Sequence, residues 1–505
     1  MRCNQLLLYR TSLRLIACIW LLLLATCASK TPHGGTLAAI QARGEITWGA
    51  DLQGGEPYLW EDPTDPTKIV GFEVDIMNGI ARRLGVKARL KHYNWSNLVQ
   101  SLQRGDFDIV FNGLEATPDR AAQILLSEPY FVYAETLAVR VGSGFRTIED
   151  LRGKRVGTLN QTFAHDLLKT QAVEIVLYEG NEEPYLDLTL GRVDAVLMDN
   201  VIADRYGCNR AGVTCLPTEV ARGIYVAGIR RSDPELKVAI DQALAGMRAD
   251  GELERILRKA KLWDDRQSTT SMTAAAQVVA SGTAAAPRHF DGNQFRLFLS
   301  ATLVTLAISL AAFLLAVPMG VLLAVARVYG GPAVRALARV YIELFRGTPV
   351  LLQLFVLYYG LAPYVNLSPI QAAIVGLGLN YGAYEAEVYR GALLALPRGQ
   401  TEAAKALGLS PIQTLRHVLV PQALRLALPP MTNDFVSLLK DSSLVSVITV
   451  IELTKRMTIA AVDLRGWLIP GVACAAFYLL LSVPLSELAR RLERRLSRDH
   501  RPATL

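Results

Sequence analysis

Residues 401–421 read TEAAKALGLSPIQTLRHVLVP and form a polar island between two apolar stretches of the chain. The island contains the capping residues that end one short helix and begin another. Gly408 suits the left-handed residue that ends a helix, and Ser410-Pro411-Ile412-Gln413 supplies an N-cap, a first-turn proline and a capping-box glutamine. Ile412, Leu415 and Leu419 then fall near one face of the second helix. The stretch predicts two short helices joined by a tight turn and flanked by membrane.

The flanking apolar stretches are long enough to cross a membrane. Leu297–Ala326 carries no charge and can cross a hydrocarbon core of about 30 Å. Gly347–Tyr384 is also uncharged but too long for one span, and the prolines and polar residues at 363–369 predict a hairpin of two spans. Leu426–Ile451 and Gly466–Ser486 follow as further spans. The second half of the chain is expected to be an all-α membrane domain of about five transmembrane helices.

Positive charge predicts the orientation of this membrane domain, residues 295–490. Basic residues follow the first, third and fifth spans, and these groups share one side if the chain enters from outside. Such loops belong on the cytoplasmic side; the loop with Lys455, Arg456 and Arg465 is an exception. The basic tail, residues 491–505, directly follows a span, which favours a cytoplasmic membrane anchor over a nucleic-acid-binding segment.

The N-terminal residues 1–28 resemble an export signal, because arginines precede the apolar run Leu15–Ala25. A signal peptide cleaved near Ala28, lipidation at Cys27 and retention as an anchor all stay open. Each of these alternatives places the following region outside the cytoplasm, in agreement with the charge pattern.

Residues 36–264 alternate helical patterns with apolar strands, which predicts an α/β domain. Cys208 and Cys215 lie seven positions apart in this extracytoplasmic domain, where disulfides persist. Spacing alone does not fix the geometry, so a disulfide and two free thiols both stay open. Residues 268–290 are rich in Ala, Ser and Thr and almost uncharged, which indicates a flexible linker.

The stretch from Glu402 to Pro421 also fits a spaced signature: Glu-Ala-Ala, three residues, Gly, nine residues, then aliphatic, any residue, aliphatic and Pro. In this signature the chain resembles the permeases of bacterial ATP-binding-cassette (ABC) importers, in the polar-amino-acid family. The resemblance implies a coupling loop, residues 397–421, that docks on a separate ATPase chain carrying ATP and Mg²⁺. It also implies a homodimer or heterodimer through the permease domain, in the plasma (inner) membrane. The residues expected to shape the docking surface are Glu402, Ala403, Ala404, Gly408 and Pro421.

The α/β region carries a second set of motifs, and in them it resembles the family-3 solute-binding proteins. These motifs include Val70-Gly71-Phe72-Glu73-Val74-Asp75, Thr117-Pro118-Asp119-Arg120 and Ser127-Glu128-Pro129-Tyr130. The resemblance implies a two-lobed periplasmic-binding-protein fold that closes on a ligand, with two crossing strands. The expected crossings are near Thr136–Arg140 and Gly223–Ile229, with lobe 1 at about 36–135 and 228–264 and lobe 2 at about 136–227.

Arg120 is the first candidate ligand residue. Thr117 can cap a helix that begins at Pro118, so Arg120 lies in the first turn, where free amide N–H groups attract anions. An arginine fork adds bidentate recognition of a carboxylate, and the resemblance gives Arg120 the α-carboxylate of an amino acid. The alternative is a structural arginine paired with Glu115 or Asp119.

Further candidates follow from the same resemblance. Asp199 follows the strand Val193–Met198 and either caps the next helix or, as the resemblance implies, binds the ligand's α-ammonium. Asp51 matches a family residue near the ligand side chain. Tyr58, or Trp60, supplies an apolar wall or belongs to the core.

Three further residues complete the expected site. Gly113 and Thr162 belong to it by resemblance, Thr162 as a carboxylate contact. Glu115 either biases the pocket toward a cationic ligand or pairs with Arg120. The segment Gln53-Gly54-Gly55-Glu56 departs from the family, so the ligand's identity is not assigned beyond a polar or basic amino acid.

The sequence holds no phosphate-binding loop of the form Gly, four residues, Gly-Lys-Ser/Thr, no zinc-site spacing and no nucleophile elbow. We therefore expect no cofactor or metal on this chain and energy from another chain. The predicted function is ATP-driven uptake of amino acids by a fused substrate-binding and permease subunit that is not an enzyme. The alternatives are a ligand-gated channel or receptor with an amino-acid-binding domain, and an enzyme akin to dehydratases related to such domains.

Overall fold

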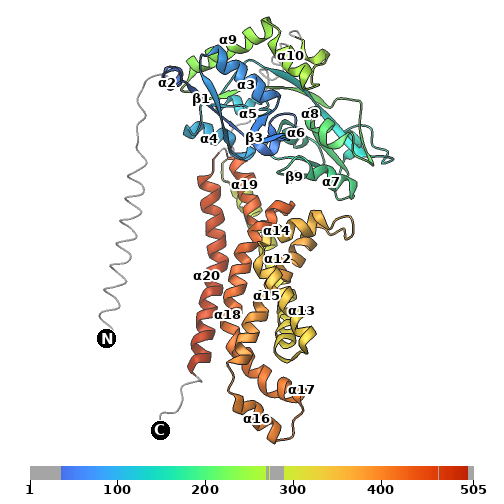
Figure 1. The fold of residues 1–505 in the computed structure, drawn as a ribbon, viewed down its shortest axis with the longest axis vertical. Helices are drawn as coiled ribbons and strands as arrows, with labels where there is room; N and C mark the ends of the chain where they lie inside the picture. The colour runs from blue at the N-terminus through green and yellow to red at the C-terminus, as the bar shows by residue number, and fades with distance from the viewer. Residues whose placement is uncertain (1–35, 269–271, 273–288, 465, 499–505) are drawn as a thin grey trace, which may run out of the picture.

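The computed structural model of the chain describes residues 36–268, 272, 289–464 and 466–498. The expected leader, most of the expected linker and residues 499–505 of the expected basic tail lie outside the described residues. The described part is an α/β region that sits at one end of an elongated helical domain (Figure 1).

The first lobe is built on a five-stranded sheet with the order β4-β1-β5-β13-β6. Its interior strand β1 is buried along most of its length, as expected for an apolar strand that pairs in parallel on both sides. The strands are β1 (Glu45–Ala50), β4 (Lys87–His92), β5 (Ile109–Val110), β6 (Leu125–Leu126) and β13 (Gly228–Ile229), with the hairpin β2 (Trp60–Asp62) and β3 (Asp65–Val70) beside them. The helices are α2 (Thr36–Arg43), α3 (Phe72–Arg83), α4 (Leu98–Arg104), α5 (Pro118–Ala121), α9 (Pro234–Ala249) and α10 (Glu252–Lys259), with the short turns η1 (Leu52–Gly54) and η2 (Trp95–Asn97).

The second lobe has a sheet of its own, ordered β11-β7-β10-β8-β9, with β12 paired to β7. Its strands are β7 (Phe131–Arg140), β8 (Arg155–Leu159), β9 (Glu174–Tyr178), β10 (Ala195–Asp199), β11 (Val213–Cys215) and β12 (Ala221–Tyr225). Its helices are α6 (Phe163–Leu168), α7 (Glu183–Thr189) and α8 (Asn200–Ile202), with the short turns η3 (Glu149–Leu151), η4 (Ala203–Gly207) and η5 (Asp265–Gln267). Cys208 and Cys215 form a disulfide with a Cα–Cα distance of 5.2 Å, which ties the end of η4 to β11.

Two chain crossings join the lobes, and they lie side by side. Ser127 N donates to Ala227 O at 2.9 Å, and Ala227 N donates to Ser127 Oγ at 2.8 Å. The second crossing falls inside the expected segment Gly223–Ile229. The first does not: β7 already belongs to the second sheet from Phe131, so the crossing precedes Thr136–Arg140. Because β7 is buried almost continuously from Phe131 to Val139, its sequence does not mark where it enters the second sheet.

The helical domain follows the linker. Its long helices are α12 (Gly292–Tyr329), α15 (Pro369–Leu394), α18 (Val420–Asp441) and α20 (Leu468–Arg498). Shorter elements connect them: α13 (Pro332–Gly347), α14 (Val350–Phe355), η6 (Val356–Gly360), α16 (Arg398–Ala406), α17 (Pro411–Thr414), η7 (Leu415–Leu419), η8 (Ser442–Ile448) and α19 (Leu453–Asp463). Glycines let α12 and α15 pack closely, since a Cβ on Gly320 would lie 2.6 Å from Glu385 Cβ.

Within the described residues, two helices are long and apolar enough to cross a membrane: α12 and Leu468–Arg491 of α20. The pair α13 and α14–η6, bent by 105°, adds a third if it is one span. The expected number was about five. The difference arises because α15 and α18 carry charged residues such as Glu385, Glu387 and Asp434, so length and composition alone do not identify them as spans. The expected turn within Gly347–Tyr384 is present between η6 and α15.

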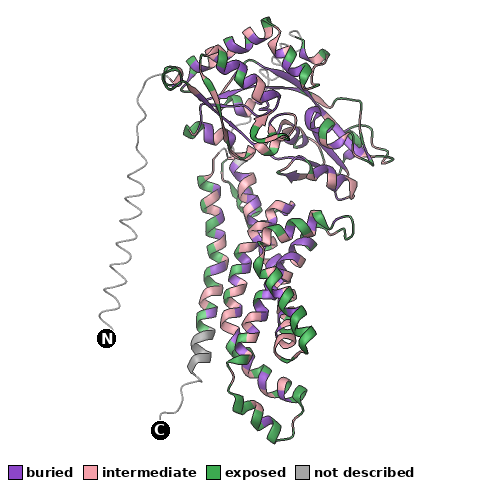
Figure 2. Ribbon diagram, viewed as in Figure 1, coloured by how far each residue is buried: buried purple, intermediate pink, exposed green. Residues whose placement is uncertain are grey.

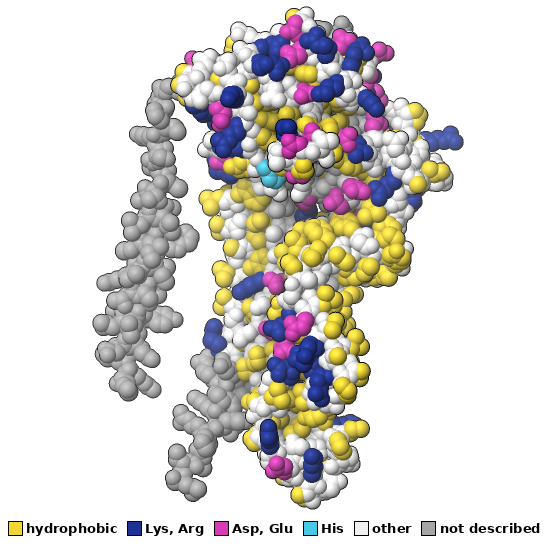
Figure 3. All heavy atoms as spheres, in the orientation of Figure 1, with side chains coloured by type: hydrophobic (Ala, Val, Ile, Leu, Met, Phe, Trp, Pro, Cys, Tyr) yellow, Lys and Arg dark blue, Asp and Glu magenta, His cyan; other side chains and the backbone are white. Residues whose placement is uncertain are grey.

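The exposed surface differs between the two regions. In the α/β region the strands form the buried core, whereas many residues on the helices of the membrane domain are exposed (Figure 2). Charged side chains gather on the α/β region, and hydrophobic side chains cover the visible face of the helical domain just below it (Figure 3). An apolar outer surface is what contact with lipid or with another membrane subunit requires.

Candidate ligand-binding site and coupling elements

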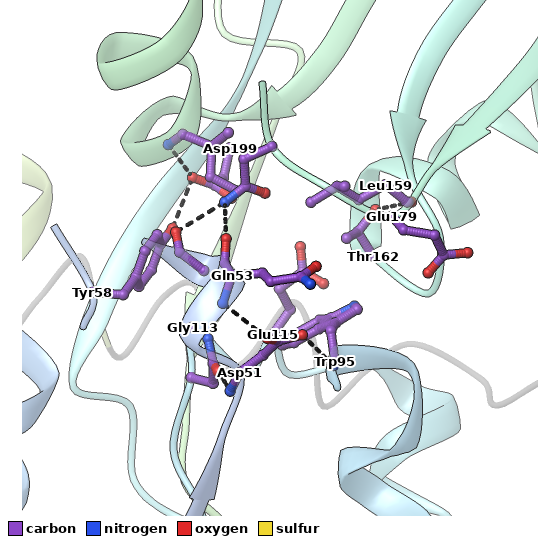
Figure 4. Close-up of a pocket in the computed structure, with 14 residues that line it drawn as sticks. Asp51, Gln53, Tyr58, Trp95, Gly113, Glu115, Leu159, Thr162, Glu179 and Asp199 are labelled. Carbon is purple, nitrogen blue, oxygen red and sulfur yellow. Dashed lines mark hydrogen bonds between the residues drawn. The ribbon is translucent and has the colours of Figure 1, made fainter. Parts of the chain in front are cut away.

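A pocket lies between the two lobes and brings together most of the expected ligand residues. Figure 4 shows Asp199 and Tyr58 on one side of it and Thr162 and Glu179 on the other. Both lobes contribute, so closure of the lobes forms the site. The lining residues are Asp51, Gln53, Gly54, Tyr58, Trp95, Asn112, Gly113, Glu115, Leu159, Thr162, Glu179, Asn181, Asp199 and Ile202.

Arg120 lies behind the pocket wall instead of lining it. As expected, Thr117 caps α5 and its side chain accepts from Arg120 N at 3.2 Å. Arg120 is only 8% exposed. Arg120 Nη1 donates to Glu115 O at 2.7 Å and to Glu115 Oε2 at 3.2 Å, and Nη2 donates to Gln161 O at 2.6 Å. The guanidinium also lies 5.1 Å from the Trp95 ring centre. Arg120 is thus paired with Glu115, in a buried setting, and bridges to the second lobe.

Asp199 has the capping role that the sequence allowed, and it also lines the pocket. It ends β10 and caps α8, because its Oδ1 accepts from Ile202 N at 2.9 Å. The same oxygen accepts from the Tyr58 hydroxyl at 3.1 Å, and Tyr58 also contacts the Tyr225 hydroxyl at 2.7 Å. Burial raises the pKa of Asp199 to about 6. A cation in the pocket would stabilise its ionised form.

Asp51 and Glu115 present further carboxylates to the pocket. Asp51 accepts from Gln53 N at 2.9 Å and from Trp95 N at 2.6 Å. Glu115 Oε2 accepts from Phe163 N at 2.8 Å in addition to Arg120. Burial raises the pKa of Glu115 to about 7, against the opposing effect of Arg120.

Thr162 and Gly113 have structural reasons for their residue type. The Thr162 hydroxyl caps α6, accepting from His165 N at 3.2 Å and donating to Leu159 O at 2.9 Å. Gly113 adopts a positive φ of 57°, and a Cβ there would lie 2.8 Å from the Tyr58 ring. Tyr58 is buried and lines the pocket, whereas Trp60 is not among the lining residues.

Sequence reasoning missed several lining residues, notably Asn112, Glu179 and Asn181. Asn112 follows β5, and Glu179 and Asn181 follow β9. Polar residues just beyond the carboxyl ends of parallel strands are typical ligand contacts in open α/β sheets. That rule could have identified all three.

Arg192 links the second lobe to the helical domain through hydrogen bonds. Its side chain pairs with Asp187 at 3.0 Å in the same lobe and crosses to the helical domain, where it donates to Tyr358 O at 3.0 Å and Asn366 Oδ1 at 2.9 Å. The guanidinium lies 3.9 Å from the Tyr358 ring centre. The Tyr358 hydroxyl donates to Asp187 at 2.9 Å, and Asn366 Nδ2 donates to Leu190 O at 2.9 Å. We call this set the Arg192 clasp.

A cavity of about 800 Å³ separates the ligand pocket from the helical domain. It shares Asp51, Gln53, Trp95, Glu179 and Asn181 with the pocket. Its other lining residues come from the α/β region and from the helical domain. On the helical side Lys455 forms an ion pair with Glu179 at 2.7 Å. A second cavity, of about 530 Å³, lies within the helical domain beside Asp434 and Asp441.

The coupling loop confirms the local predictions. Gly408 has a φ of 76° after α16, and Ser410 and Gln413 form the capping box of α17. Glu402, Ala403, Gly408 and Pro421 are exposed, while Ala404 is buried. Ile412 is 77% exposed and Leu407 81% exposed, whereas Leu419 is buried. The loop lies at the end of the helical domain opposite the binding lobes (Figure 1).

Comparison with known proteins agrees with this architecture. Residues 49–261 match the bacterial extracellular solute-binding proteins, family 3, and residues 316–498 match the inner membrane component of binding-protein-dependent transport systems. A glutamine transport system permease protein of Escherichia coli (strain K12) is 42% identical over 197 residues, covering 38% of this chain and 90% of the relative. An L-cystine transport system permease protein of Bacillus subtilis (strain 168) is 36% identical over 196 residues, covering 38% and 84%.

Among solved structures, an ancestral arginine-binding protein bound to arginine is 30% identical, with a TM-score of 0.40, and the match covers 43% of this chain and 98% of that chain. The permease matches include nearly whole relatives, and the solute-binding match precedes them in the same polypeptide. The chain therefore belongs to the amino-acid ABC importer family and joins a family-3 solute-binding domain to a permease domain.

Proposed function

We propose that this chain imports a polar or basic amino acid, using energy from a separate ATPase subunit that binds ATP and Mg²⁺. The observation that carries this proposal is the placement of two functional elements at opposite ends of one helical domain. The ligand pocket lies at one end, and the exposed coupling loop lies at the other. The cavity beyond the pocket supplies a route between the lobes and the membrane domain.

In this proposal the binding domain faces the outside and the coupling loop and tail face the cytoplasm of a bacterial cell. Asp199 takes the ligand's α-ammonium, and Asp51 and Glu115 favour a positively charged side chain. The membrane domain pairs with a second copy or a related permease, and exposed apolar side chains on α13, such as Leu337 and Leu344, supply surface for lipid or that partner. ATP binding by the partner moves α16 and α17, and the permease opens toward the docked lobes.

Uptake of radiolabelled amino acids tests the proposal in a strain that lacks other importers for the solute. Gly408→Asp forces a side chain into a left-handed backbone at the docking surface, so it should abolish uptake while ligand binding to the purified full chain persists. Gly399→Ala, in the same loop, is the matched control. Unchanged uptake by Gly408→Asp contradicts the coupling role, and ligand-evoked current without ATP would identify a channel instead.

A thermal-shift screen of the purified full chain against the amino acids tests the ligand class. Asp199→Ala should remove the shift. Asp194→Ala, which breaks a pair with Arg140 and Arg155 elsewhere in the second lobe, should leave it. A shift that survives Asp199→Ala would place the ligand site elsewhere.

A further inference from the structure

The charges around the ligand pocket are unbalanced. Four carboxylates line it, those of Asp51, Glu115, Glu179 and Asp199, and no lysine, arginine or histidine lines it in the described part of the chain. Two of the four have cationic partners just outside the pocket: Glu115 pairs with Arg120, and Glu179 pairs with Lys455. The carboxylates of Asp51 and Asp199 have no such cationic partner among the residues that line the pocket.

The hydrogen bonds to these two carboxylates come from neutral donors. Asp51 accepts from backbone N–H groups, and Asp199 accepts from a backbone N–H and the Tyr58 hydroxyl. His92 Nδ1 lies 4.0 Å from Asp51, beyond hydrogen-bond distance, and accepts a bond from Leu52 N. A buried charge needs a charged partner, and a ligand with two positive centres would supply both.

Glu115 already occupies the group that would hold a ligand carboxylate. Both Nη atoms of Arg120 donate within the protein, and the bond to Glu115 Oε2 is the arrangement an incoming carboxylate would otherwise make. The backbone N–H of Phe163, at the start of α6, is also taken by Glu115. A ligand carboxylate that used Arg120 Nη1 and Phe163 N would have to displace Glu115, itself only 3% exposed.

We propose that Glu115 replaces the ligand carboxylate in this site, so that the pocket selects a dicationic ligand with no carboxylate, of the class of decarboxylated basic amino acids. This inference rests on the proposed function, because it takes the inter-lobe pocket as the ligand site. It keeps the pocket and the transport function but changes the ligand from a basic amino acid to the amine formed by its decarboxylation. Asp199 and Asp51 then recognise the two positive groups of that amine.

Ligand affinity of the full chain in detergent, measured by calorimetry for arginine and for agmatine (arginine without its carboxylate), tests the proposal. Agmatine should bind at least tenfold more tightly than arginine, about the effect of one charge-assisted hydrogen bond. Glu115→Gln keeps the side-chain size but frees Arg120, so it should tighten arginine and weaken agmatine, each by about tenfold. Glu254→Gln, which breaks a surface pair with Arg258, is the matched control and should change neither affinity.

The outcomes separate the inference from the function on which it rests. Arginine binding more tightly than agmatine in the unaltered chain overturns the inference but supports uptake of a basic amino acid. Failure of both compounds to bind overturns the cationic ligand class itself. The comparison in the unaltered chain decides the matter even if Glu115→Gln does not fold.

Discussion

The Arg192 clasp predicts how strongly the second lobe is held on the membrane domain. Arg192→Ala removes two hydrogen bonds to Tyr358 and Asn366 and leaves the carboxylate of Asp187, whose side chain is 1% exposed, without its guanidinium. Removing one partner of a buried ion pair costs about 3–5 kcal/mol. Because Asp187 also accepts from the Tyr358 hydroxyl across the interface, we assign most of this cost to the docked state. The docking equilibrium should shift by roughly 10²- to 10³-fold.

Hydrogen exchange of the full chain in lipid nanodiscs measures this shift. The backbone at 356–366 should exchange faster in Arg192→Ala, and uptake should fall at least tenfold, while ligand affinity stays within a factor of about two because the pocket is not lined by the clasp. Arg222→Ala removes an exposed arginine paired with Glu219 in the same lobe and serves as control.

Two results would refute this reasoning. Unchanged exchange at 356–366 would show that the clasp does not hold the domains together. Loss of ligand binding in Arg192→Ala, in step with uptake, would show that Arg192 maintains the fold of the lobe and not its docking.

Three further predictions concern the binding domain. Gly113→Ala should lower ligand affinity and destabilise the chain by about 1–3 kcal/mol, because a Cβ there meets the Tyr58 ring at a positive φ. Gly142→Ala, the control, also has a positive φ but open space around it and should cost about 1 kcal/mol. Chemical denaturation measures the free energy of unfolding of both variants. Asp199 has a folded pKa of about 6, above its ordinary value of 3.8, so its contribution to stability is fully present below about pH 4 and is lost as pH rises through 6. Asp199→Asn should flatten that fall and stabilise the ligand-free chain at pH 7 by roughly 1–3 kcal/mol, seen as a higher melting temperature; a steeper profile would contradict the assignment. Cys208→Ser should destabilise the second lobe by about 2 kcal/mol, since the disulfide closes a short loop; an unchanged melting temperature under oxidising conditions would contradict this.

Local chemistry made part of the structure predictable. Gly408 and the capping box at Ser410–Gln413 were found because a left-handed C-cap and an N-cap depend on a few adjacent residues. The same holds for Thr117 and Pro118 at the start of α5. The alternation of helix and strand likewise followed from short-range patterns.

Long-range packing accounts for what the sequence did not reveal. The residues of the Arg192 clasp lie 166 positions or more apart where they cross between domains, so no local pattern connects them. The pairing of Arg120 with Glu115 was foreseen as an alternative, but its burial against Gln161 depends on how the lobes close. Glu385 of α15 is buried where α15 packs on α12, which composition does not record.

The central claim is that a ligand bound between the lobes crosses the membrane only when an ATPase engages the coupling loop. The most direct measurement is uptake by proteoliposomes that contain the full chain and its co-purified ATPase subunit, with labelled arginine or agmatine on the side of the binding lobes. Accumulation is expected only when ATP is present on the side of the coupling loop, and none is expected with Gly408→Asp. Accumulation without ATP, or with Gly408→Asp, would contradict the claim.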